Sequence, residues 1–309
     1  MANYRVGDIV RLSRNYIGMS QEELAFQAGL ATETISRIES GKHKISAETY
    51  KKIMGALNRF PERSFAICSR SDMEIIEEKK LLEEAEVKYE LDDAEYYISR
   101  IKEQIGDNKI DWQYVLRAEA MQKFFRDDKD TKPVIHGLEQ ALRCTIKDWD
   151  FGEYKEKKYP YTFQELLILM NLSGLYSIDK QCEKALGMYG MILKCLDSGY
   201  ICGDDMENFR IVIKRNMTIT YEIMGEYELA LQILEEVLEE SIVLKYGPMI
   251  PLALYDMAWN MKKINEVNQC EKYSSEEINE KLKQTYYVAS ARGDNHIKNL
   301  AERLQNYDG

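Results

Sequence analysis

The chain has 309 residues, of which 45% are hydrophobic and 31% charged, so it holds enough apolar side chains to bury cores in two domains. This composition excludes wholesale disorder. The apolar stretches are too short to cross a membrane, and the N-terminal segment is amphipathic where a cleavable leader would be apolar. We therefore expect a cytoplasmic protein with no membrane partner.

The residue types favour one fold class. Only five prolines occur, and Leu, Glu, Lys, Met and Ala are abundant, which predicts an all-α protein. The six cysteines and three histidines are scattered and show no metal-binding spacing. We expect free thiols, no disulfide framework, no metal site and no cofactor.

The charge is unevenly distributed along the chain. Residues 1–60 hold nine basic and six acidic residues, a formal charge of +3, whereas the whole chain carries -11 and the remainder therefore -14. A basic head on an acidic body indicates that only the head meets phosphate, because the body repels it.

The sequence of the head, residues 1–60, predicts four short helices. The first spans 5–17, the second opens at Ser20 with Glu23 completing a capping box, the third spans about 31–39 and the fourth 46–57. Two helices joined by a tight turn at Gly29 indicate a helix-turn-helix. The segment SQEELAFQAGLATETISRIESGK resembles the helix-turn-helix of the lambda/434-repressor and Xre superfamily.

That resemblance implies that the third helix lies in the major groove. Arg37 is the best specificity candidate because its guanidinium can pair bidentately with guanine, and Glu33 can accept from a cytosine amino group. Gln21 resembles the family's phosphate-contacting glutamine. Ala31 stands where the family has a capping Ser or Thr, so we expect Thr32 to cap the helix instead. The complete set of expected DNA contacts is Gln21, Thr32, Glu33, Thr34, Ser36, Arg37, Lys42, His43 and Lys44.

Four charged positions of the head are assigned to the fold or to solvent. Arg14 and Glu39 resemble the family's partly buried ion pair between the first helix and the end of the third. Lys51 and Lys52 read as a solvated helix face.

The acidic body carries an internal repeat of about 45 residues. A small alanine recurs in the second helix of successive helix pairs, at Ala94, Ala141, Ala185 and Ala230. Tyr221, Gly225, Tyr227 and Ala230 resemble a tetratricopeptide repeat. We predict helix pairs at 73–105, 111–147, 161–197, 205–242 and 250–272, then closing helices at 275–291 and 294–306.

These elements define the expected architecture. It is an N-terminal lambda-repressor-like domain at 1–66, a linker at 67–72 and a right-handed α-solenoid of tetratricopeptide-like repeats at 73–309. Pro61, within the stretch 58–72, marks a natural hinge.

The first helices of the repeats share a polar position. Asn171, Asn216 and Asn260 recur at spacings of 45 and 44 residues. A carboxamide offers both a donor and an acceptor, so an asparagine ladder can hold the backbone of an extended peptide. The other interpretation is that each asparagine makes a hydrogen bond between helices of the scaffold.

The combination resembles the peptide-pheromone receptors of the Rgg, PlcR and PrgX group, which regulate quorum sensing in Gram-positive bacteria. The resemblance implies a homodimer on a palindromic operator, with a short imported peptide in the concave groove. Asn171, Asn216 and Asn260 would hold the peptide backbone, and Phe209, Ile213, Thr220, Met257 and Leu167 would shape its side-chain pockets. Arg117 is a candidate for a peptide carboxylate, or a solvated helix charge.

Two other functions are considered. In the first, the head binds DNA and the repeats are a protein-docking and dimerisation scaffold without a small ligand. The second is a catalytic body, which the sequence disfavours because we find no phosphate-binding glycine loop and no metalloprotease or serine-hydrolase motif. We expect no enzyme.

Overall fold

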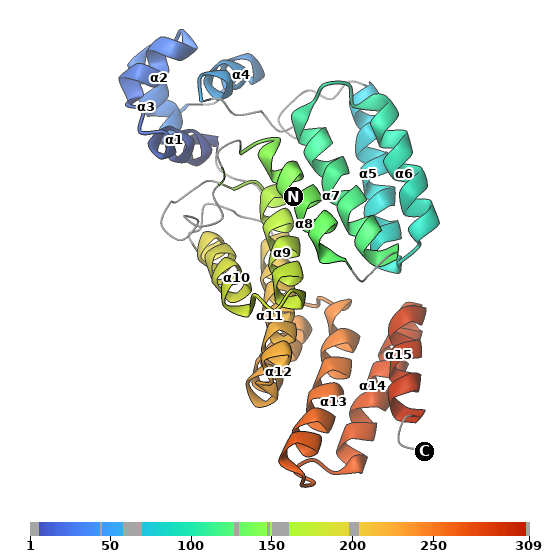
Figure 1. Cartoon of the computed structure of the whole chain (residues 1–309). Coiled ribbons are helices and arrows are strands. Elements are labelled where there is room, and N and C mark those ends of the chain that lie inside the picture. Colours follow the sequence, from blue (N-terminus) through green and yellow to red (C-terminus); the bar gives the residue numbers. More distant parts are fainter. Residues whose placement is uncertain are drawn as a thin grey trace. The chain divides into compact units, whose positions relative to one another are not determined.

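The structure is a computed structural model of the whole chain, and it describes residues 6–43, 45–57, 70–126, 130–146, 149, 161–197 and 204–306. Every regular element in these ranges is an α-helix, from α1 near the N-terminus to α15 (Figure 1). The expected all-α fold class is therefore confirmed.

The described residues fall into two compact units. The first unit holds residues 6–172 together with 194–197, and the second holds 173–193 together with 204–306. The first contains the head and the early repeats, and the second contains the late repeats and the C-terminal helices.

The head is built from four helices, as predicted: α1 (Val6–Tyr16), α2 (Gln21–Ala28), α3 (Thr32–Glu39) and α4 (Ala47–Ala56). Their apolar faces meet in one core that includes Val10, Leu24, Ile35 and Ile53. Gly29 ends α2 with a φ of 65°, a left-handed conformation that glycine adopts without steric cost. The tight turn between α2 and α3 depends on this residue.

The helices α1 and α3 approach each other at Gly7. A Cβ atom on Gly7 would collide with the carbonyl oxygen of Ile38 and would lie 3.1 Å from the Cα of Glu39. Only glycine allows the backbones to come this close, so Gly7 sets the distance between α1 and the recognition helix.

We expect Gly7→Ala to destabilise the head by about 1–3 kcal/mol, because the added methyl must push α1 away from α3. Hydrogen exchange of the α3 amides measures this loss. The control is Gly55→Ala in α4, where an added Cβ meets no atom within 4 Å. That change should not lower α3 protection, and an equal loss of protection in the two substitutions would contradict the close-approach argument.

The body begins with two helical hairpins in the first unit, α5 (Arg70–Lys88) with α6 (Leu91–Gln104) and α7 (Lys109–Arg126) with α8 (Thr131–Arg143). Neighbouring helices of this set pack on one another (Figure 1). The first predicted helix begins at residue 73, whereas α5 begins at Arg70, within the expected linker 67–72. The rest of the hinge segment, with Pro61, lies outside the described residues.

The later helices are α9 (Phe163–Ile178), α10 (Cys182–Asp197), α11 (Asp204–Met224), α12 (Tyr227–Val243), α13 (Met249–Asn268), α14 (Ser275–Arg292) and α15 (Asn295–Asn306). The predicted pair at 250–272 is wrong, because a single helix, α13, fills most of that range and packs against α14. It ends at Gln269, a left-handed residue with a φ of 51° that gives no glycine signal in the sequence.

The repeat register is confirmed. The recurring alanines lie in α6, α8, α10 and α12, and each is at most 1% exposed. The turns repeat as well: Tyr89, Lys180 and Gly225 all have positive φ and close the α5–α6, α9–α10 and α11–α12 connections. At each turn the next residue donates its backbone N–H to a carbonyl five residues earlier, as Glu226 does to Tyr221. Only the third of these turns carries a glycine.

Candidate DNA and ligand interfaces

The recognition helix predicted from the sequence is α3. Ile35 and Ile38 anchor its inner face in the head core. Its outer face carries four of the predicted contact residues, all exposed: Thr32, Glu33, Ser36 and Arg37. Neither Glu33 nor Arg37 has an ion-pair partner within the described part of the chain, so both charges are available to a ligand.

The start of α3 differs from the expectation. Ala31 occupies the N-cap position and makes no side-chain capping bond, and Thr32 is the first residue of the helix. The prediction that Thr32 caps α3 is therefore wrong. Its exposed hydroxyl therefore makes no capping bond to the helix.

Four further predicted contacts surround α3. Thr34 is half-buried, and Lys42 and His43 are exposed just beyond the C-terminal end of the helix. Lys44 lies outside the described residues. Of these two exposed residues, Lys42 adds one full positive charge beside the helix, on the side expected to meet the phosphate backbone of DNA.

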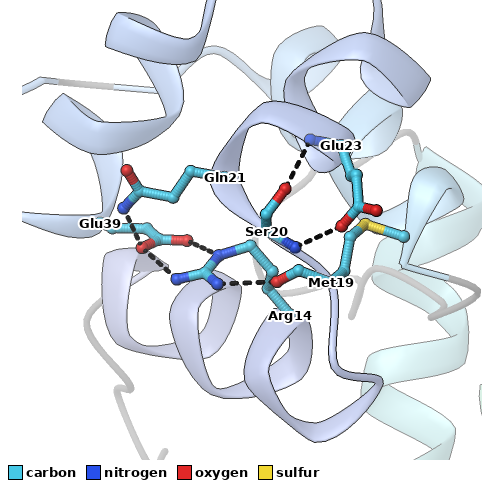
Figure 2. Close-up of polar contacts among 6 residues, drawn as sticks. All are labelled: Arg14, Met19, Ser20, Gln21, Glu23 and Glu39. Carbon is cyan, nitrogen blue, oxygen red and sulfur yellow. Dashed lines mark hydrogen bonds and ion pairs between the residues drawn. The ribbon is translucent and has the colours of Figure 1, made fainter.

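A buried ion pair joins the first and third helices, as the family resemblance implied. Arg14 Nε donates to Glu39 Oε1 at 2.7 Å, and Arg14 Nη2 donates to Glu39 Oε2 at 3.0 Å (Figure 2). Arg14 also donates to the carbonyl oxygen of Met19 at 2.8 Å. The bond to Glu39 raises the pKa of Arg14 above its ordinary value. Removing one partner from such a pair leaves a buried charge, so the network holds α1 and α3 together.

Gln21 belongs to the same network. Its Nε2 donates to Glu39 Oε2 at 2.7 Å, which the sequence analysis did not foresee (Figure 2). The amide has two N–H groups, so one remains for a phosphate. Ser20 and Glu23 form the predicted capping box in front of it, with bonds of 3.1 and 2.7 Å. The bonds from Ser20 lower the pKa of Glu23.

The three asparagines predicted to bind a peptide do not share one environment. Asn171 is partly exposed and lies in the first unit, where its Oδ1 is buried and has no hydrogen-bond partner within the described chain. Asn216 and Asn260 lie in the second unit, on α11 and α13. Asn216 is partly exposed, and its side chain makes no hydrogen bond to the described residues.

Asn260 is 0% exposed, and its side chain makes a hydrogen bond from α13 to α11. Its Nδ2 donates to Glu222 Oε1 on α11 at 2.6 Å and to the carbonyl oxygen of Asp256 at 2.8 Å. For this residue the structure favours the scaffold interpretation over direct contact with a peptide backbone. Its Oδ1 is buried and has no partner in the described residues.

The apolar residues proposed to shape ligand pockets are buried. Phe209, Ile213, Thr220 and Met257 are each at most 5% exposed. The Thr220 hydroxyl shares a hydrogen bond of 2.7 Å with the Ser177 hydroxyl. In this structure the side chains of these four residues are buried, and their role in shaping peptide pockets stays a prediction. Leu167 is partly exposed.

Arg117 is neither a solvated charge nor open to a carboxylate of a ligand. It is 5% exposed, and its Nη2 pairs with Glu86 Oε2 on α5 at 2.9 Å. The guanidinium also lies 5.5 Å from the ring centroid of Tyr114. The interpretation as a solvated charge is wrong, because the side chain holds α7 against α5.

A cluster of polar side chains that the sequence analysis missed joins α11 and α13. We call it the Glu222 cluster; it consists of Arg215, Glu222, Tyr255, Asp256 and Asn260. Arg215 Nε pairs with Asp256 Oδ2 at 2.7 Å. Burial raises the pKa of Glu222 to about 7; the Asn260 bond lowers it, Asp256 raises it and Arg215 lowers it. The available signal was the spacing of Asp256 and Asn260, four residues apart on an otherwise apolar helix face.

The raised pKa gives a pH-dependent stability. Since the folded pKa lies above the ordinary value of 4.5, the folded state binds the proton more tightly, and stability falls as pH rises from about 4.5 through 7. We expect Glu222→Gln to raise the free energy of unfolding by roughly 1–3 kcal/mol at pH 8 and by much less at pH 5. Denaturant titrations at both pH values measure this. The control Glu226→Gln removes an exposed carboxylate and should change nothing, and a pH-independent gain for Glu222→Gln would contradict the assignment.

Other kinds of site are not evident. Within the described ranges, the four cysteines Cys144, Cys182, Cys195 and Cys270 form no disulfide. Among the described residues, no three or more His, Cys, Asp or Glu side chains cluster in a way that could hold a metal ion. Among those same residues, no helix combines the length and the apolar character needed to span a membrane.

The comparisons with known proteins agree with this architecture. Residues 11–62 match the family model described as helix-turn-helix. The chain is similar to PlcR of Bacillus thuringiensis in complex with the peptide PapR7 and DNA, with a TM-score of 0.64 and 16% identity over 97% of this chain and 99% of that one. The search of curated proteins gives no match.

Two further solved structures resemble the chain. The apo form of PlcR from Bacillus thuringiensis gives a TM-score of 0.57 at 14% identity, covering 97% of this chain and 99% of that one. ComR from S. thermophilus, in complex with DNA and its signalling peptide ComS, gives 0.51 at 14% identity, covering 98% and 99%. At such identities the likeness establishes the fold: a helix-turn-helix head followed by helical repeats.

Proposed function

We propose that this chain is a sequence-specific DNA-binding transcriptional regulator whose repeats sense a short intracellular signalling peptide. It acts as a cytoplasmic homodimer on a palindromic operator. The observation that carries the proposal is the exposed polar face of α3, positioned by a buried network in a domain that matches the helix-turn-helix model. The resemblance in fold to PlcR and ComR supports the peptide as ligand.

The head supplies affinity and specificity in different ways. Lys42 and His43 lie where they can contact phosphate, which positions the protein without reading sequence. Arg37 reads guanine through two parallel hydrogen bonds to O6 and N7. Because the head is the basic part of an acidic chain, only this surface attracts DNA.

The repeats supply regulation. A peptide changes DNA binding only if it binds one arrangement of the dimer more tightly than another. The proposed domain boundaries are 1–66 for the head and 73–309 for the repeats, with a joint at 67–72 whose last residues extend α5. Asn171 and Asn216, whose side chains are partly exposed, are the proposed contacts to the peptide backbone.

We expect Arg37→Ala to abolish sequence-specific DNA binding while the fold stays intact, because the side chain is exposed and makes no ion pair within the described chain. Selection of bound duplexes from a randomised pool, followed by binding titrations, measures the preference. Loss of a bidentate contact costs about 1–3 kcal/mol of discrimination. The control Lys51→Ala, on the exposed side of α4, should retain the selected sequence. An unchanged preference in Arg37→Ala would remove Arg37 from the interface.

We expect Asn216→Ala to weaken peptide binding about five- to tenfold, the value of one to two hydrogen bonds, without changing the melting temperature. Heptapeptides recovered from a synthetic library by the full chain serve as probes. Asn299→Ala, an exposed change on α15, is the matched control and should bind normally. Equal losses of stability and of binding in Asn216→Ala would favour a scaffold role.

A second candidate function has one observation in its favour. The end of α12 exposes three consecutive apolar residues, Ile242, Val243 and Leu244, at 58, 71 and 43%. Such a run suits a contact with another protein, so the repeats can act as a docking and dimerisation scaffold without a small ligand. If no heptapeptide binds but Val243→Glu weakens self-association, this function replaces the peptide sensor.

A further inference from the structure

The charges of the Glu222 cluster do not balance. Arg215 on α11 pairs with Asp256 on α13, so Glu222 has no ion pair of its own among the described residues, although Arg215 lies close enough to lower its pKa. The titratable and charged groups that face Glu222 are Arg215 on its own helix and Asp256 and Tyr255 on α13. A half-buried carboxylate in this position is stabilised by any positive charge that reaches it.

Asn260 provides a second unsatisfied group beside that carboxylate. Both acceptors near its Nδ2 are oxygen atoms, Glu222 Oε1 and the Asp256 carbonyl, so the amide is held in one orientation. Its Oδ1, on the same carboxamide, is buried without a partner in the described chain. A buried acceptor that lacks a donor is costly, and a ligand that supplies the donor recovers this energy.

The atoms that lack a hydrogen-bond donor are therefore all acceptors. The Glu222 cluster carries one more negative charge than positive charge. The complementary group is a cation with several N–H donors, and a compact ammonium fits that description. A carboxylate is repelled. The two helices involved, α11 and α13, are the first helices of their repeats, which also carry the partly exposed Asn216.

We propose that Glu222, held in place by Asn260, receives an ammonium group of the signalling peptide, so that the receptor selects peptides that carry a positive charge. The inference rests on the proposed function, since it assumes a peptide ligand. The ammonium can come from the N-terminus of the peptide or from a lysine side chain. Glu222 makes the contact, and Asn260 positions the Glu222 carboxylate through the bond of 2.6 Å.

The test uses the full chain and three pools of synthetic heptapeptides, all without Arg and His. Pool one has free N-termini and no lysine. Pool two has acetylated N-termini and includes lysine. Pool three is acetylated and has no lysine, so it carries no positive charge. Bound peptides are identified by mass spectrometry, and their Kd values are measured against the wild type, Glu222→Gln and the control Glu226→Gln.

We expect binding from pool one or pool two but not from pool three, and the productive pool identifies the source of the ammonium. Glu222→Gln should weaken this binding about tenfold or more, the loss of one charge-assisted hydrogen bond, while Glu226→Gln binds normally. Since the pKa of Glu222 is raised to about 7, binding to the wild type should weaken several-fold from pH 7.5 to pH 6, and Glu222→Gln should not show this change.

Two results would overturn the inference, and they are distinguishable. If pool three binds as tightly as the others, or if Glu222→Gln binds as tightly as the wild type, the ammonium site is wrong and the peptide-sensing function stands. If no pool binds, the peptide-sensing function fails and this inference fails with it.

Discussion

The geometry of the head depends on one buried carboxylate. Glu39 ends the recognition helix, and its two oxygen atoms accept hydrogen bonds from Arg14 on α1 and Gln21 on α2. A carboxylate taken out of water is costly unless donors surround it, so the three helices are held where those donors meet. Gly7 then lets α1 approach α3 closely enough for Arg14 to reach. This arrangement fixes the positions of the exposed side chains of α3.

The second unit contains a carboxylate, Glu222, that has no ion pair of its own among the described residues. Glu222 also accepts from an amide, Asn260, but the neighbouring arginine is engaged by Asp256. The compensated carboxylate of the head fits a structural role, whereas the uncompensated one keeps a capacity for a ligand. Burial raises the pKa of this second carboxylate, Glu222, to about 7.

The sequence predicted best where a local pattern encodes the structure. The capping box of Ser20 and Glu23, the turn at Gly29 and the buried alanines of the repeats depend on residues close in the chain. The ion pair of Arg14 and Glu39 was predicted because the family resemblance supplied the distant partner.

The sequence predicted poorly where the partner lies far away in the chain or where a helix ends without a marker. Asn260 is buried by a bond to Glu222, 38 residues earlier, and Arg117 by one to Glu86, 31 residues earlier. Periodicity indicates which face a residue occupies, but it does not identify the polar group opposite. The end of α13 at Gln269 was missed because a residue other than glycine adopts the left-handed conformation there.

The turns at Tyr89, Lys180 and Gly225 have a consequence for how such helical repeats diversify. Each reverses the chain through main-chain hydrogen bonds, so the geometry of the reversal does not require a particular side chain. A whole hairpin can therefore be exchanged by recombination between relatives at these points while the path of the chain is kept. New ligand preferences can arise by such shuffling of modules, without redesign of the scaffold that carries them.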